Sequence, residues 1–180
     1  MRYLFVLVMT MMTAFAHAEL TPEKIQQWLP TMKPVQEWME ANESKVDTHS
    51  LFKSSSKGLS GMFDEAITEL KNAGLYDDFA GLLKKHGYAS VEGWAADTQG
   101  VTTAFMAIKM EGEQINPAMI QAQIVQVKDS PLPDEQKRVM LGMLEGTLAM
   151  MKEVSAVPEG DKAVVRPHMK AIEQSFGHGH

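Results

Sequence analysis

Residues 59–70 read LSGMFDEAITEL, and apolar side chains recur there at every third or fourth position. The apolar positions are Leu59, Met62, Phe63, Ala66, Ile67 and Leu70. This spacing predicts an amphipathic helix whose apolar side packs against a core. It is the clearest pattern of its kind in the chain, and it indicates a helical protein.

The same helical period continues on both sides of this stretch. No segment alternates apolar and polar residues as a half-buried strand would, and prolines and glycines interrupt the pattern at short intervals. Further helices are predicted over residues 22–29, from residue 34, and over 75–86, 90–108, 117–127, 134–154 and 161–176. We therefore expect an all-α fold, a single compact bundle of about seven or eight short-to-medium helices over residues 19–180.

The helix predicted over residues 134–154 is the longest and is rich in methionine. Apolar residues cover most of its circumference, and Glu145, Lys152 and Glu153 leave only a narrow polar strip. A helix of this kind is usually central in its bundle, so a buried position is predicted. The alternative is a surface for a partner, with an apolar groove beside the helix. The residues predicted for that groove are Trp38, Met140, Gly142, Met143, Gly146 and Met150.

Residues 1–18, MRYLFVLVMTMMTAFAHA, have the pattern of a secretory signal peptide. Arg2 is followed by an apolar run, and residues 16–18 form an A-x-A cleavage signature, so cleavage is expected near Ala18. The run is too short to cross a bilayer, which takes about 20 apolar residues, and no later stretch is longer. The mature chain is therefore expected in the periplasm, with no integral membrane segment.

Composition and motifs exclude several classes of function. Cysteine is absent and the formal net charge is −6, which excludes disulfides and argues against nucleic acid as a partner. The common nucleotide, zinc-protease, serine-hydrolase and calcium motifs are missing. Ser54 and Lys57 match the S-x-x-K pattern of one class of serine enzymes, but the S-D-N and K-T-G partner motifs are absent. We expect no enzyme activity and no cofactor.

Histidine and methionine leave a metal-binding alternative open. His178 and His180 form a His-Gly-His end that could bind copper, nickel or zinc through imidazole nitrogens. Fifteen methionines are present and four fall within residues 1–18, so eleven remain in the mature chain. Their thioethers suit copper(I), although methionine also fills irregular cores and makes adaptable binding surfaces.

Residues 82–90, LLKKHGYAS, together with Trp94 and the later AIKME at residues 107–111, resemble small exported helical proteins of proteobacteria that have no assigned activity. The resemblance implies export and an all-helical fold, and it carries over no functional residue. The function predicted from the sequence is non-catalytic binding of a protein partner or a small apolar ligand. The alternative function is periplasmic copper or nickel binding through methionine side chains and the His-Gly-His end.

Overall fold

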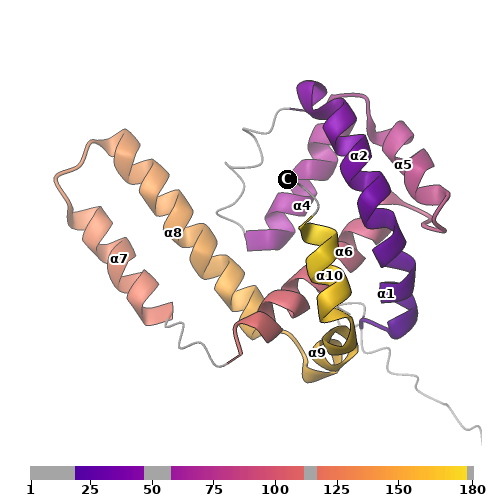
Figure 1. The fold of residues 1–180 in the computed structure, drawn as a ribbon. Coiled ribbons are helices and arrows are strands. Elements are labelled where there is room, and N and C mark those ends of the chain that lie inside the picture. The colour runs from indigo at the N-terminus through magenta and orange to yellow at the C-terminus, as the bar shows by residue number, and fades with distance from the viewer. Residues whose placement is uncertain (1–18, 47–57, 112–116, 178–180) are drawn as a thin grey trace, which may run out of the picture.

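The computed structural model describes residues 19–46, 58–111 and 117–177, and within these ranges the chain is helical with no strand (Figure 1). The predicted all-α fold is confirmed. The helices are α1 (Pro22–Trp28), α2 (Met32–Asn42), α4 (Gly58–Asn72), α5 (Tyr76–Lys84), α6 (Val91–Lys109), α7 (Pro117–Asp129), α8 (Asp134–Ser155), α9 (Glu159–Val165) and α10 (Met169–Phe176), with the 3₁₀ turns η1 (Leu29–Thr31), η2 (Glu43–Lys45) and η4 (Arg166–His168).

Three sequence predictions fall outside the described residues. They are the signal peptide of residues 1–18, the Ser54–Lys57 motif and the histidines at 178 and 180. Among the described helices, none combines the length and the hydropathy needed to cross a bilayer.

Side-chain caps set the starts of two helices. The hydroxyl of Thr21 accepts a hydrogen bond from the backbone N–H of Lys24 at 3.3 Å, and Ser90 does the same for Gly93 at 3.1 Å. These bonds satisfy backbone N–H groups that have no partner in the first turn of a helix. The helices α1 and α6 therefore begin where the sequence predicts.

The central helix of the bundle is α6, which packs against α1, α4, α5, α8 and α9. Its buried residues include Val91, Trp94, Val101 and Ala104. Gly93 and Gly100 lie within this helix, yet it runs unbroken to Lys109. The Leu20 side chain packs closely against Gly100, and a Cβ at position 100 would lie 3.2 Å from it. The glycine is therefore a site of close packing rather than a break.

The C-terminal helices close the bundle over its N-terminal helices. The buried carboxylate of Asp161 in α9 accepts a hydrogen bond from the backbone N–H of Leu20 at 2.9 Å. In α10, the ring of Phe176 meets Trp28 edge-on at a centroid distance of 6.1 Å. These contacts fix the start of the described chain against its end.

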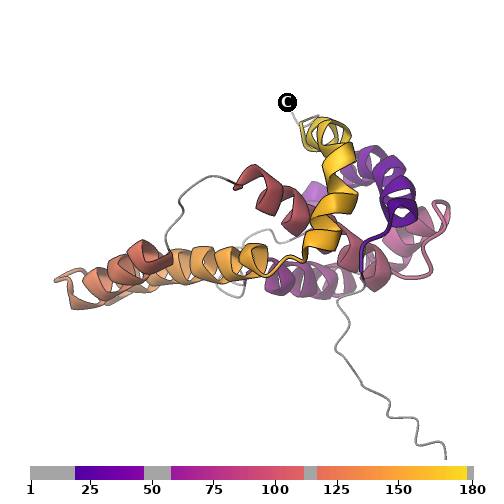
Figure 2. The ribbon, with the colours of Figure 1, turned by 90° about the horizontal axis from the view of Figure 1, so that it is seen from below.

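The helices α7 and α8 form a hairpin that projects from the rest of the molecule (Figures 1 and 2). The C-terminal part of α8 packs against α4 and α6, where Gly146, Met151 and Val154 are buried. Its N-terminal part packs chiefly against α7. The prediction of a buried central helix over residues 134–154 is therefore wrong. Only its last turns reach the bundle, and α7 covers one side of the remainder.

Candidate functional site

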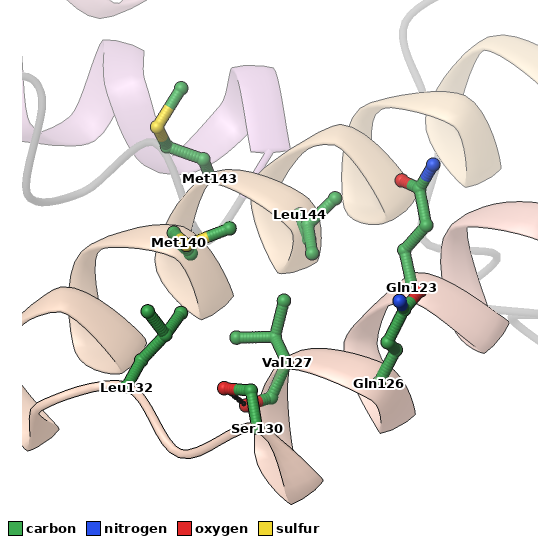
Figure 3. A pocket seen from close by; sticks show the side chains of 8 residues that line it. All are labelled: Gln123, Gln126, Val127, Ser130, Leu132, Met140, Met143 and Leu144. Atoms are coloured by element: carbon green, nitrogen blue, oxygen red, sulfur yellow. Dashed lines mark hydrogen bonds between the residues drawn. The ribbon is translucent and has the colours of Figure 1, made fainter.

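A groove of about 500 Å³ runs between α7 and α8 on the projecting hairpin, which we call the arm groove (Figure 3). Its floor is apolar, and its edge on α7 carries two glutamines. The lining residues are Gln123, Gln126, Val127, Ser130, Leu132, Met140, Met143 and Leu144. Figure 3 shows Val127 and Leu144 pointing toward one another across the groove, with the Met143 thioether directed away from α7.

A short proline-rich connection holds the two helices of the hairpin together. Ile124 and Val127 are the buried residues of α7. The Ser130 hydroxyl donates to the backbone carbonyl of Val127 at 2.7 Å, which closes the last turn of α7. The Lys137 ammonium then reaches back to the carbonyl of Lys128 at 3.1 Å. The turn is therefore fixed by hydrogen bonds, and the groove has a defined end.

The hairpin carries most of the large apolar side chains that are exposed in the described structure. On α7 these are Met119 and Val125, which are 62% and 51% exposed. On α8 they are Val139 at 53%, Met140 at 42% and Met143 at 66%. Large exposed apolar patches mark interaction sites more often than scattered single residues do.

The charges on the hairpin nearly cancel. Residues 117–155 carry four lysines and arginines and five acidic residues, a net charge of −1. The Glu135 carboxylate is paired with the Arg138 guanidinium one turn away, and this hydrogen bond lowers the pKa of Glu135. The pair is exposed near the start of α8, where each charge offsets the other.

The structure separates the residues predicted for one apolar groove. Met140 and Met143 line the arm groove. The Cα of Gly142 faces open space, with no atom within 4 Å of where a Cβ would lie, whereas Gly146 is buried. Met150 is half-buried and lines neither this groove nor the pocket that contains Trp38. The α8 residues of the predicted groove are therefore divided between the exposed and the packed part of that helix.

Trp38 lies in a second site, a pocket of about 420 Å³ between α2, α4, α5 and α6, which we call the body pocket. No single stretch of the sequence predicts this pocket. The signal that points to it is the amphipathic stretch 59–70, because Phe63, Ile67 and Leu70 from that stretch line the pocket and remain only partly buried. The sequence does not show which helices pack around residues 59–70, because that depends on tertiary packing.

Buried polar groups in the bundle are occupied by structural partners. Asp97 is 9% exposed, and its carboxylate lies 3.4 Å from the Lys24 ammonium. The Tyr88 hydroxyl donates to the same carboxylate at 3.2 Å, and burial together with the Asp97 charge raises the pKa of Tyr88. A tyrosine held neutral beside a paired carboxylate is typical of a structural network.

The described residues contain no group of three or more histidine, aspartate or glutamate side chains able to hold a metal ion. His178 and His180, the predicted metal-binding pair, lie outside those residues. The copper or nickel alternative stays a prediction from the sequence.

No protein-family model, no curated protein and no solved structure matches this chain at a significant level. The two apolar sites, on the hairpin and in the bundle, are therefore the observations from which a function can be inferred.

Proposed function

We propose that the mature chain is an exported, non-catalytic interaction protein that uses the α7–α8 hairpin to dock an apolar helix of a protein partner. The export step is the one that residues 1–18 suggest. The observation that carries the docking proposal is the exposure of Met119, Val139, Met140 and Met143 on a hairpin that projects from the bundle.

Leaving these side chains in water has a free-energy cost that a partner would remove. Fully burying one side chain of this size contributes about 1.5–3 kcal/mol relative to exposure. Methionine is flexible and polarizable, so it adapts to an apolar surface without a fixed shape. Several exposed methionines on one hairpin therefore supply an adaptable apolar docking surface.

A helix is the shape of partner that the arm groove favours. The groove lies between two packed helices, and an amphipathic helix can lay its apolar face along such a groove. The hairpin has a net charge of −1, whereas the rest of the mature chain carries twelve basic and eighteen acidic residues, a net charge of −6. Charge complementarity therefore favours a partner helix with basic flanks over a second copy of this acidic chain.

The non-catalytic part of the proposal is supported by the chemistry of the arm groove. Its polar lining consists of Gln123, Gln126 and Ser130, which include no strong acid, base or nucleophile–base pair. Positioned groups of that kind are what general acid–base or covalent catalysis requires.

Site-specific photocrosslinking in exporting bacterial cells tests this proposal. A photoreactive amino acid is placed at position 143 on the α7–α8 hairpin and, as a matched control, at position 62 on α4. Both sites hold exposed methionines, at 66% and 39%. We expect a discrete adduct with another protein from position 143 and none from position 62. Adding Met140→Glu should abolish the adduct, because it places a charge in the apolar groove.

Two outcomes would contradict the proposal. One is that position 143 gives no adduct, or gives an adduct that Met140→Glu does not abolish. The other is an adduct between two copies of this chain, which would replace a distinct partner with self-association.

A further inference from the structure

The body pocket has the size and lining of a small-molecule site. Its volume of about 420 Å³ falls within the roughly 300–1,000 Å³ usual for ligand pockets. Most of its lining is apolar, and polar groups gather at one end. The lining residues are Trp38, Met39, Glu40, Asn42, Glu43, Val46, Phe63, Ala66, Ile67, Leu70, Phe79, Val91, Trp94 and Ala95.

One wall of the pocket is a row of fixed aromatic rings. The rings of Trp38 and Phe79 are 4.7 Å apart, and those of Phe79 and Trp94 are 5.5 Å apart and edge-to-face. The Trp38 indole N–H donates to a carboxylate oxygen of Asp78 at 2.7 Å, and the Trp94 indole N–H donates to the Thr31 hydroxyl at 2.8 Å. Both indole donors are occupied, so this wall offers ring faces and not hydrogen bonds.

The opposite wall is the apolar face of α4, which the bundle leaves incompletely covered. The buried residues of α4 are Gly58 and Gly61. Phe63, Ile67 and Leu70 contact the core but stay partly exposed. The helix with the clearest amphipathic pattern in the sequence thus has its apolar face directed at a cavity. A ligand in that cavity would complete its burial.

The polar end of the pocket is acidic. Glu40 and Glu43 lie at the end of α2 and in η2, and within the described chain neither carboxylate forms an ion pair. The α2 helix has no basic residue in its last turn, where its dipole is negative. The nearby Lys45 ammonium donates to the side-chain oxygen of Asn42 at 2.9 Å and keeps its charge. Among the described residues at this end, two carboxylates outnumber one ammonium, so the local charge favours a positive group.

From this juxtaposition we infer that the body pocket binds a small, largely apolar molecule carrying one cationic amine. Its apolar part would lie between the Trp38–Phe79–Trp94 rings and the apolar face of α4. Its ammonium group would lie near Glu40 and Glu43, where a neighbouring indole face also favours a cation. This site is separate from the arm groove and does not depend on the docking proposal.

Three dansyl dyes that differ mainly in charge test the inference in fluorescence titrations of the mature protein. They share one five-methylene chain and differ in its end: dansylcadaverine ends in an ammonium group, 5-(dansylamino)pentanol in a neutral hydroxyl, and 6-(dansylamino)hexanoate in a carboxylate. We expect dansylcadaverine to bind about two- to five-fold more tightly than 5-(dansylamino)pentanol, the factor that one exposed ion pair supports. The carboxylate dye should bind most weakly.

Three variants test whether the dyes bind in the body pocket. Ala66→Phe places a ring in the pocket and should weaken all three dyes, whereas Ala163→Phe on the exposed surface of α9 should weaken none. The double variant Glu40→Gln/Glu43→Gln should remove the advantage of the cationic dye and leave the affinity for 5-(dansylamino)pentanol unchanged. If circular dichroism shows that Ala66→Phe is unfolded, this double variant still tests whether the dyes bind in the body pocket.

Several results would overturn the inference. They are an absence of saturable binding, equal affinity for the cationic and anionic dyes, or a cationic preference that persists in the Glu40→Gln/Glu43→Gln variant. Loss of binding in Met143→Glu would move the dye site to the arm groove. Failure of photocrosslinking from position 143 would leave these outcomes unaffected.

Discussion

Two tryptophans and two threonines form a closed ring of hydrogen bonds. The ring connects the end of α1 and the 3₁₀ turn η1 to the central helix α6. The Trp28 indole donates to the Thr98 hydroxyl at 2.8 Å, and Thr98 donates to the backbone carbonyl of Trp94 at 2.7 Å. The Trp94 indole donates to Thr31 at 2.8 Å, and Thr31 returns to the carbonyl of Trp28 at 2.6 Å. Each hydroxyl thus both accepts and donates within the core.

Thr98→Val tests the energetic importance of this ring. Valine keeps the shape of threonine but leaves the buried Trp28 indole N–H without a partner, which costs about 1–3 kcal/mol. We expect the free energy of unfolding, measured by urea denaturation, to fall by that amount. Thr68→Val is the matched control, because Thr68 makes the same bond to the carbonyl four residues earlier on an exposed surface. Equal losses in both variants would contradict the account.

The tryptophans illustrate what single residues could and could not predict. Their burial follows from their size and apolar character. The sequence did not show that Trp28 and Trp94 would meet through threonines, because these pairs are 70 and 63 residues apart along the chain. Trp38 was placed beside the methionine-rich helix, but it lies in the body pocket instead.

At the scale of elements, α8 holds the start of α4 in place. The Glu153 carboxylate accepts hydrogen bonds from the backbone N–H of Leu59 at 2.9 Å and from the Ser60 hydroxyl at 3.0 Å. Gly58 has φ +79, and a Cβ there would lie 2.5 Å from Glu153 Oε1. The positive φ favours glycine at this position, where the carboxylate approaches the helix terminus.

Glu153→Ala should expose the first turn of α4 and lower the free energy of unfolding by about 0.5–2 kcal/mol, as removal of a helix cap does. Hydrogen exchange should become faster at the amides of residues 59–61. Glu145→Ala, at an exposed position on the same helix, is the control and should leave those amides unchanged. Unchanged exchange in Glu153→Ala would show that this carboxylate does not cap α4.

The existence and limits of the helices could largely be predicted from local signals, including the caps at Thr21 and Ser90, the proline that begins α7 and the prolines before α8. Which apolar helix becomes central could not, since α6 and α8 are both apolar over much of their surface. The choice depends on contacts between distant segments. Met140 and Met143 line a groove against α7, and not one shared with Trp38. No single stretch of the sequence predicts the body pocket, because it is assembled from four helices.

At the scale of the whole molecule, the described chain is a helical bundle with an apolar hairpin projecting from it (Figure 2). The bundle encloses the body pocket, and the hairpin carries the arm groove. The proposed partner would contact the hairpin, and the inferred amine ligand would enter the bundle. The two sites therefore predict separate binding activities that separate variants can remove.

The hairpin should be free in the isolated protein and covered by its partner in the cell. Methionine oxidation by peroxide reports this directly, since an accessible thioether converts to the sulfoxide. Residue-resolved mass spectrometry would compare the purified mature protein with the same protein in intact exporting cells. Met151 is 5% exposed and serves as the slow reference, and Met62, 39% exposed, serves as the control outside the arm.

We predict that Met119 and Met143 oxidise several-fold faster than Met151 in the purified protein and become protected in cells, while Met62 reacts equally in both. Oxidation of Met143 as slow as that of Met151 in the purified protein would contradict an exposed hairpin. Equally fast oxidation of Met143 in both settings would contradict a docked partner.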